Sequence, residues 1–325
     1  MKKAASVTKI SLQFAITIFV LAAAFILSLS LGAEKLPFKT IFGGGDKFQN
    51  IILWNIRLPR SLLVLVTGIL LGGSGAVFQM FFRNPLAEPG IMGISSGATL
   101  GAVCASVLGF GVGINVSAFA GAILAGAFVT TLAFSRAGRN SSVMLLLCGT
   151  ALGTLYSSIS SMILLTSNKE LHSIYSWILG SFSGRSWKEL YFIIIPAAIS
   201  LIMMFCISRP LDLLTGGEKS AASLGVEVNR LRILVLISGA LAVSCSVCAG
   251  GTIGFVGLIA PHIVRKLLGP KAKILIPFSM MFGGILLLVS DTFARVIIAP
   301  AELPAGIITS ILGVPFFLTL CLKKD

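Results

Sequence analysis

Long apolar stretches, separated by short polar breaks, repeat along the entire chain. Most of them reach the roughly 18–20 apolar residues that a helix needs to cross a bilayer. Because the stretches are continuous rather than alternating, they predict helices and not the strands of a membrane barrel. The ten stretches lie at about 10–32, 61–82, 91–109, 112–135, 142–166, 190–208, 231–249, 253–268, 274–298 and 305–322. The sequence therefore predicts one all-α, polytopic membrane domain over residues 1–325, with about ten transmembrane helices.

Two of the stretches depart from a plain membrane helix. The first follows MKKAASVTKI and is longer than the roughly 7–15 apolar residues of a signal peptide, so we expect a retained first helix. The stretch at 253–268 is short and contains Pro261 and His262. A short or broken helix is stable in a membrane only where protein or a water-filled cavity surrounds it. We therefore expect this segment inside the bundle or beside a cavity.

The composition excludes a soluble globular domain, because 56% of the residues are hydrophobic, 11% are charged and the mean hydropathy is +1.01. The net charge of +14 does not indicate nucleic-acid binding. The lysines and arginines lie between the apolar stretches, where they orient a membrane protein. With a cytoplasmic N-terminus, 16 of the 25 fall on the cytoplasmic side and 9 outside. This excess predicts that both chain ends are cytoplasmic.

A weak internal similarity relates the two halves of the chain. LVTGILLGGSG at 65–75 is similar to LISGALAVSCS at 236–246, and each copy follows an arginine-rich entry. Five helices separate the copies, so they are predicted to run in opposite directions, as in the inverted repeats of many transporters. Chance similarity between apolar stretches is the alternative. Glycines also recur at helical spacing, which favours close helix packing over ligand contacts, at Gly68/Gly72, Gly93/Gly97/Gly101, Gly149/Gly153 and Gly250/Gly254.

Catalytic and metal-binding patterns are absent from the sequence. TGGEKS at 215–220 lacks the spacing of a phosphate-binding loop, so ATP is not expected to bind this chain. The two histidines, His172 and His262, are not clustered with carboxylates, which argues against a metal site. A Ser95–His262 protease pair lacks any oxyanion site nearby. The six cysteines are predicted to be small apolar residues, including the CxxC pair at 245–248. We expect no catalytic residue, metal or cofactor in this chain.

Asp291 is a carboxylate inside an apolar stretch, a position that by default indicates a functional site. Arg295 follows one helical turn later, so a local ion pair is the simpler interpretation. A proton relay is the alternative.

Two polar segments outside the predicted spans carry more information. On the cytoplasmic side, LDLLTGGEKSAASLGVEVNRLR at 211–232 predicts a short helix over EKSAASL, with Ala221 and Leu224 on one face. Small amphipathic helices of this kind suit docking into the groove of a partner. On the outer side, SIYSWILGSFSGRSWKEL at 173–190 predicts a bent, re-entrant element near a pore mouth, or an aromatic belt at the interface. RNPLAEPG at 83–90 combines Arg83, Asn84, two prolines and Glu88 in a cytoplasmic hinge.

Several blocks resemble the permease subunits of type II ABC importers for iron–siderophore, haem and cobalamin, the FecCD-type family. They occur in family order and span nearly the whole chain. The blocks are NIRLPRSLLVLVTGILLGGSGAVFQMFFRNPLAEPGIMGISSGATLGA (55–102), WILGSFSG (177–184), GEKSAASLGVEVNRLR (217–232), GTIGFVGLIAPHIVRKLLG (251–269) and SDTFARVIIAPAELPAGIITSILGVPFFL (290–318). Lys219 departs from the family, in which many members carry a second acidic residue at this place.

The resemblance implies a ten-helix subunit in a bacterial cytoplasmic membrane. Its implied partners are a second permease subunit, identical or homologous, two ATPase subunits on the cytoplasmic side, and a substrate-binding protein outside. The main coupling segment would be 212–227, with ATPase contacts at Glu218, Ala221, Leu224, Gly225, Arg83, Asn84 and Pro85. Arginines that match those of the family, Arg57, Arg60 and Arg295, would receive glutamates of the binding protein; headgroup contact or pairing with Asp291 and Glu302 is the alternative.

A large chelate needs a wide path lined by small or apolar residues. The helices at 61–82, 142–166 and 231–249 are candidates for this lining, with Gly153, Ser157 and Ser161 as specific candidates. We expect an ATP-driven importer of an iron chelate of the siderophore type. Cobalamin or haem import is the alternative within the family, and a secondary transporter or channel that works without ATPase subunits is the alternative outside it.

Overall fold

The computed structural model describes residues 2–34, 36–109, 113–134, 142–167 and 172–322. Within these ranges the chain is helical and contains no strand, which confirms the all-α prediction. Each of the ten predicted stretches is a helix: α1 Lys2–Ser30, α4 Leu58–Phe81, α5 Ile94–Leu108, α6 Ile114–Phe134, α8 Ser142–Leu165, α10 Trp187–Cys206, α13 Val228–Gly250, α14 Val256–Leu268, α15 Ala272–Val296 and α16 Ala305–Leu322. The connecting helices are α2 Phe38–Ile41, α3 Lys47–Ile51, η1 Ile52–Arg57, η2 Pro89–Met92, α9 His172–Ile178, α11 Ser208–Leu214 and α12 Glu218–Ser223.

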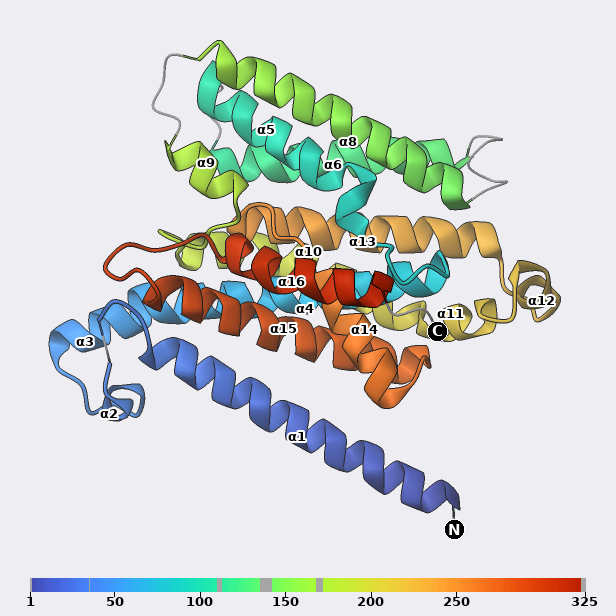
Figure 1. The fold of residues 1–325 in the computed structure, drawn as a ribbon, viewed down its shortest axis with the longest axis horizontal. Coiled ribbons are helices and arrows are strands. Elements are labelled where there is room, and N and C mark those ends of the chain that lie inside the picture. Colours follow the sequence, from blue (N-terminus) through green and yellow to red (C-terminus); the bar gives the residue numbers. More distant parts are fainter. Residues whose placement is uncertain (1, 35, 110–112, 135–141, 168–171, 323–325) are drawn as a thin grey trace.

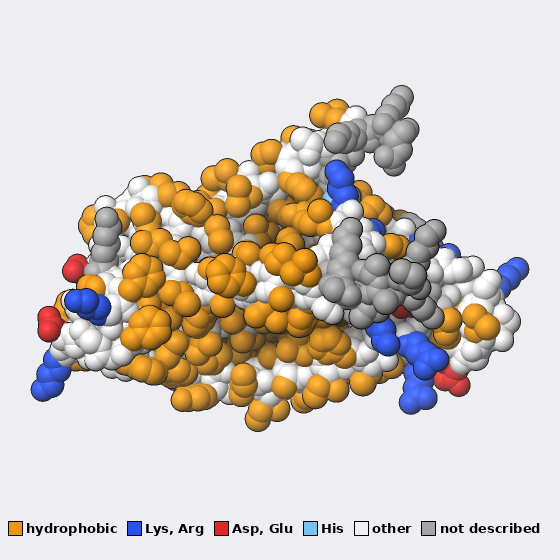
Figure 2. Space-filling model, turned by 90° about the horizontal axis from the view of Figure 1, so that it is seen from below, with side chains coloured by type: hydrophobic (Ala, Val, Ile, Leu, Met, Phe, Trp, Pro, Cys, Tyr) orange, Lys and Arg blue, Asp and Glu red, His pale blue; other side chains and the backbone are white. Residues whose placement is uncertain are grey.

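Seven helical segments of the described chain are long and apolar enough to cross a membrane. The apolar helices α5 and α16 are shorter, and α14 has only 13 residues. Hydrophobic side chains cover the middle of the molecule, and the charged side chains gather at its two ends (Figure 2). This distribution is what a bilayer requires, because lipid surrounds the middle of the bundle and water meets its ends.

Helices α4 and α13 form the centre of the bundle. Both are mostly buried, and α4 packs along α15 through glycines. A Cβ atom at Gly68 would lie 2.4 Å from the Gly283 carbonyl oxygen, and one at Gly72 would lie 2.1 Å from the Ser279 carbonyl oxygen. These contacts confirm the packing interpretation of the glycine spacing, since only glycine lets the two backbones approach so closely. α4 and α13 also run in opposite directions, as the repeat predicted (Figure 1).

The bundle is elongated, and different elements lie at its two ends (Figure 1). The start of α1, the last turn of α16 and the short helix α12 lie at one end, named here the α12 end (Figure 1). Helices α2, α3 and α9 lie at the opposite end, named here the α3 end. Helix α1 thus begins, and helix α16 ends, at the same end of the bundle, as an even number of membrane crossings requires.

Candidate functional site

The α12 end carries the predicted coupling segment. Gly217, with φ of 108°, starts α12 in a conformation that favours glycine, and Gly225, with φ of 85°, ends it. Ala221 is fully buried, whereas Leu224 is 65% exposed. The expectation that these two residues share one face is therefore wrong: Ala221 anchors the helix to the bundle, and Leu224 faces outward.

An ion pair links α12 to the central helices. Glu218 lies 3.7 Å from the Nη2 atom of Arg232, which is on α13. The guanidinium group of Arg232 lies over the ring of Phe81, the last residue of α4, at 6.0 Å from the ring centre. Direct contacts thus link α12 to α13 and to the end of α4.

RNPLAEPG divides into an exposed turn and a buried segment. Arg83 takes a left-handed conformation with φ of 49°, and the Asn84 side chain accepts a hydrogen bond of 2.9 Å from the Leu86 backbone N–H. Arg83 and Pro85 are exposed, in agreement with a surface hinge. The chain then turns inward, because Glu88 is only 7% exposed. The surface prediction therefore holds for the first half of the motif and not for Glu88.

Glu88 meets the first turn of α14. A Cβ atom at Gly257 would lie 3.0 Å from the Glu88 Oε1 atom, so the carboxylate lies directly against this turn. The carbonyl oxygen of the same glycine accepts a hydrogen bond of 3.2 Å from Nε2 of Gln79 on α4. A Cβ atom at Gly75 would lie 2.0 Å from that carbonyl, so α4 and α14 cross at van der Waals contact here. The first part of the short α14 is thus packed inside the bundle, as its length predicted.

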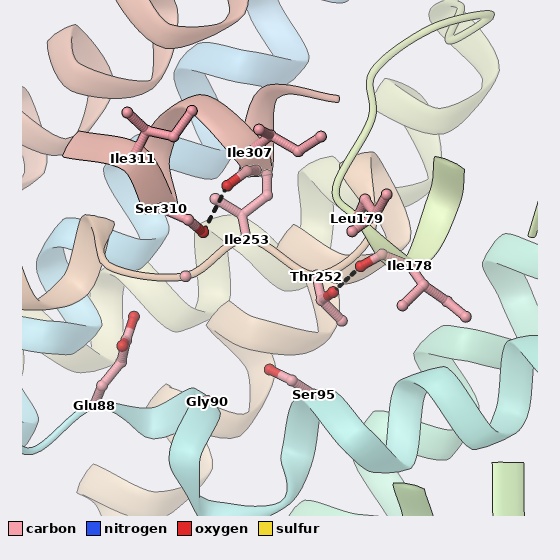
Figure 3. A pocket seen from close by; sticks show the side chains of 12 residues that line it. Glu88, Gly90, Ser95, Ile178, Leu179, Thr252, Ile253, Ile307, Ser310 and Ile311 are labelled. Atoms are coloured by element: carbon pink, nitrogen blue, oxygen red, sulfur yellow. Dashed lines mark hydrogen bonds between the residues drawn. The ribbon is translucent and has the colours of Figure 1, made fainter. Parts of the chain in front are cut away.

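A cavity of about 580 Å³, cavity 1, opens beside Glu88 (Figure 3). Three segments pack closely around it through glycines. Gly306, at the start of α16, donates its backbone N–H to the Gly180 carbonyl at 3.0 Å. A Cβ atom at Gly251 would clash with the Trp177 carbonyl, so these two backbones are also in contact. The bent segment after α9 therefore packs at the cavity, which agrees with the predicted re-entrant element. The lining residues are Glu88, Gly90, Ser95, Ile178, Leu179, Thr252, Ile253, Gly254, Gly306, Ile307, Ser310 and Ile311.

A second cavity of about 570 Å³, cavity 2, shares Ser95, Ile178 and Thr252 with cavity 1. Hydroxyl groups of α5 and α8 line it, and the predicted path residues Ser157 and Ser161 are among them. The complete lining is Ser95, Ser96, Thr99, Ser157, Ser160, Ser161, Leu164, Leu165, Tyr175, Ile178 and Thr252. The two cavities are therefore adjacent, and hydroxyl-bearing side chains line both.

Other path candidates do not line these cavities. Gly153 is buried, and a Cβ atom there would lie 3.4 Å from Gly93, so this position packs α8 against the start of α5. Helices α4 and α13, the stretches at 61–82 and 231–249, are absent from the described lining of cavities 1 and 2. These two helices are the buried centre of the bundle, so path lining by them stays a prediction that cavities 1 and 2 do not support. Residues of α16 and the 252–254 segment line cavity 1 instead.

The three arginines predicted for docking lie at the α3 end and are buried. Arg57, Arg60 and Arg295 are 5%, 6% and 3% exposed. Arg60 forms ion pairs with Asp291 at 2.9 Å and with Glu302 at 2.8 Å.

Arg295 pairs with Asp291 at 3.2 Å, which confirms the local ion pair predicted from the sequence. Arg57 donates to the carbonyls of Leu29 and Ser30, both at 2.7 Å. The described chain therefore shows the internal pairing that was the alternative to docking.

Residues that could hold a metal ion are scattered. Within the described ranges, no three His, Cys, Asp or Glu side chains lie close enough together to do so. His262 packs edge-on against the ring of Phe316, at 5.6 Å between centres. Cys245 and Cys248 are fully buried, as expected for small packing residues.

Sequence reasoning did not anticipate that Glu88 would line a cavity. A signal was present, because Glu88 is the only acidic residue between Asp46 and Glu170. Thr252 and Ser310 carried no comparable signal, since single hydroxyl residues are common in membrane helices.

Comparisons with known proteins agree with this architecture. The cobalamin import system permease protein BtuC of Halobacterium salinarum is 39% identical over 284 residues, which cover 87% of this chain and 76% of that protein. The hemin transport system permease protein HmuU of Yersinia pestis is 36% identical over 311 residues, covering 91% of each chain. A solved structure, described as an inward-facing conformation of a metal-chelate type ABC transporter, is 34% identical, matches with a TM-score of 0.85 and covers 95% of this chain and 98% of that one. The model of the FecCD transport family matches residues 20–323, so the chain belongs to this family of ABC importer permeases.

Proposed function

We propose that this FecCD-family permease is the membrane subunit of an ATP-driven importer that carries a bulky metal chelate inward. The observation that carries the proposal is the match of the entire fold to a metal-chelate type transporter. Two permease subunits, identical or homologous, two separate ATPase subunits and an extracytoplasmic binding protein would make up the complete machine. The α12 end would face the cytoplasm, in agreement with the charge bias of the sequence.

ATPase contacts are proposed at the α12 end. The exposed Leu224 and the exposed turn at Arg83, Asn84 and Pro85 are available to a partner there. Ala221 would support this surface from below rather than touch the ATPase, because it is fully buried. Glu218 and Gly225 complete the proposed contact.

Force from the ATPase would travel from α12 through the Glu218–Arg232 ion pair into the central helices. Such a chain of packed contacts is a physical route for coupling between distant sites. Cavities 1 and 2, including Ser157 and Ser161, would form one side of the translocation path, and the second permease subunit would supply the other side.

The identity of the chelate is the finer part of the proposal. The sequence favoured an iron–siderophore, whereas two relatives are permeases for cobalamin and for haem. The walls of cavities 1 and 2 carry hydroxyls and aliphatic side chains rather than a ligand set for a bare metal ion. This lining suits a chelate whose metal is already enclosed.

Reconstitution in proteoliposomes tests the function. The chain would be assembled with its ATPase subunits and binding protein, and uptake of cyanocobalamin, haemin and ferrichrome would be followed with and without ATP. We expect ATP-dependent accumulation of at least one of these chelates. Uptake by the permease alone, without ATPase subunits, would instead identify a secondary transporter or channel and overturn the proposal.

A further inference from the structure

Glu88 is the acidic group of the cavity wall. It is the one ionisable carboxylate among the described residues that line cavities 1 and 2. It is only 7% exposed, and its carboxylate points from the α4–α5 connection toward the space bounded by Ser95, Thr252 and Ser310 (Figure 3). A carboxylate placed in such surroundings is costly unless something stabilises it, and intramembrane acids usually have a functional role.

The position of this carboxylate is fixed by the backbone. It lies against Gly257 in the first turn of α14, and the N-terminus of a helix favours a negative charge. A Cβ atom at Gly257 would lie 3.0 Å from the Glu88 Oε1 atom, so the glycine allows this close approach. The buried Pro89 restricts the backbone next to it. The carboxylate is therefore a buried acceptor packed against α14 rather than a mobile surface charge.

The hydroxyl groups of the same wall are committed as donors elsewhere. Ser310 donates to the Gly306 carbonyl at 2.8 Å, and Thr252 donates to the Ile178 carbonyl. Because a carbonyl oxygen only accepts, the hydroxyl protons point into the wall and the oxygen lone pairs remain for the cavity.

The same arrangement continues in cavity 2. Ser160 donates to the Tyr156 carbonyl at 2.8 Å and Ser161 to the Ser157 carbonyl at 2.9 Å. The hydroxyl groups of Thr252, Ser310, Ser160 and Ser161 thus offer acceptors, and Glu88 is the strongest acceptor of the two linings.

We propose that Glu88 is a specificity-determining contact of the translocation path, one that accepts hydrogen bonds from amide or ammonium groups on the outside of the cargo and disfavours peripheral carboxylates. The inference rests on the proposed function, because it requires cargo to pass cavity 1. A charge-assisted hydrogen bond to a donor contributes more than a neutral one, whereas a second carboxylate in the same cavity is repelled. The path would select neutral or cationic, amide-bearing chelates.

A purely structural role for Glu88 makes a different prediction. Gln at this position has nearly the same size and still places a carbonyl oxygen beside the first turn of α14, so the shape of the wall is retained. Only the charge is removed. If Glu88 merely holds α14, Glu88→Gln should leave the relative uptake of different cargoes unchanged.

The experiment uses the complete importer in proteoliposomes with its ATPase subunits and binding protein. The probes are cyanocobalamin, whose periphery carries amides, its monocarboxylic acid derivative, in which one amide is hydrolysed, and haemin, which carries carboxylates. Initial ATP-dependent uptake rates give the ratio of the amide form to the acid form. We expect wild type to favour the amide form and Glu88→Gln to lower that ratio about tenfold, the effect of about one charged hydrogen bond.

Two further variants make the outcome decisive. Ser310→Ala removes a hydroxyl acceptor from the facing wall and should lower the ratio by a smaller factor, which keeps the inference testable if Glu88→Gln assembles poorly. Glu34→Gln, an exposed acid outside both cavities, is the matched control and should keep the wild-type ratio.

An unchanged ratio in an assembled Glu88→Gln importer would overturn the inference and leave the importer function intact. Wild-type uptake of haemin without uptake of cyanocobalamin would do the same. Uptake of any probe in the absence of the ATPase subunits would overturn the proposed function instead.

Discussion

Replacing Asp291 by Asn tests whether the arginine cluster at the α3 end holds this chain together. Asp291 is fully buried and contacts two guanidinium groups, Arg60 at 2.9 Å and Arg295 at 3.2 Å. Asn keeps the size of the side chain but removes the negative charge. It also turns an amide donor toward at least one arginine N–H donor, so a hydrogen bond is lost as well.

The expected loss follows from the geometry. At an effective dielectric constant of about 20, each charge pair at about 4 Å attracts by about 4 kcal/mol, before desolvation is subtracted. Removal of one partner from a buried pair costs about 3–5 kcal/mol, since the other charge is left uncompensated. Arg60 keeps Glu302 at 2.8 Å and Arg295 keeps the Ser28 oxygens at 2.9 Å, so the lower end of this range, about 3 kcal/mol, is expected.

The assay is unfolding of the purified chain in mixed micelles by titration with a denaturing detergent. Glu302→Gln is the matched control. The Glu302 side chain is 28% exposed, so water and salt screen its pair with Arg60 and its loss should cost about 1 kcal/mol or less. The loss in the free energy of unfolding should therefore be about 2 kcal/mol larger for Asp291→Asn than for Glu302→Gln, because Asp291 is buried and Glu302 is not.

Equal and small losses in both variants would refute this reasoning. So would an Asp291→Asn chain that unfolds like wild type but no longer binds the substrate-binding protein. That second result would show that Arg57, Arg60 and Arg295 serve the partner, as the family resemblance implied. Binding measured at low and high salt would separate the two roles further, because exposed pairs are screened over about 8–10 Å.

Three further predictions concern other parts of the chain. Leu224→Asp should abolish cargo-stimulated ATP hydrolysis and reduce uptake at least tenfold while the chain keeps its stability, because the side chain is 65% exposed; ATPase activity of the assembled complex and thermal unfolding measure this, and wild-type stimulation would contradict the coupling role. Gly72→Leu should destabilise the chain by about 3 kcal/mol or more, since even a Cβ atom would lie 2.1 Å from the Ser279 carbonyl oxygen. Unfolding by detergent measures this loss, and a variant as stable as wild type would show that α4 and α15 can move apart at little cost in free energy. Ser161→Leu should slow uptake while expression is retained, whereas Gly153→Leu should lower both in parallel; the reverse pattern would exchange their roles in path and packing.

The helices and their order were predictable from the sequence, because lipid imposes one simple requirement on each segment. A membrane helix must be apolar over a minimum length and must satisfy its own backbone hydrogen bonds. The local sequence therefore determines where each helix lies. The ion pair between Asp291 and Arg295 was equally local, being one helical turn apart. Glycine spacing likewise predicted close packing, although the partner of each glycine could not be named.

The path and the surfaces were decided by tertiary structure. Which side of a helix meets a neighbour depends on how all the helices pack, and in lipid both sides can be apolar, so the sequence carries no amphipathic stripe to read. For this reason the sequence could not show that α4 and α13 are the buried centre of the bundle. On α12, outside the spans, Ala221 and Leu224 were placed on one face, but only the packing of α12 on the bundle decides that Ala221 is buried and Leu224 exposed.

Glu88 shows the same limit most clearly. The sequence determined that an isolated acid stands between two apolar helices, but only the inward turn after Asn84 and the contact with Gly257 bring it to the cavity. Segments far apart in the chain, at Glu88, Thr252 and Ser310, meet there because the helices that carry them cross, and no local pattern encodes that crossing.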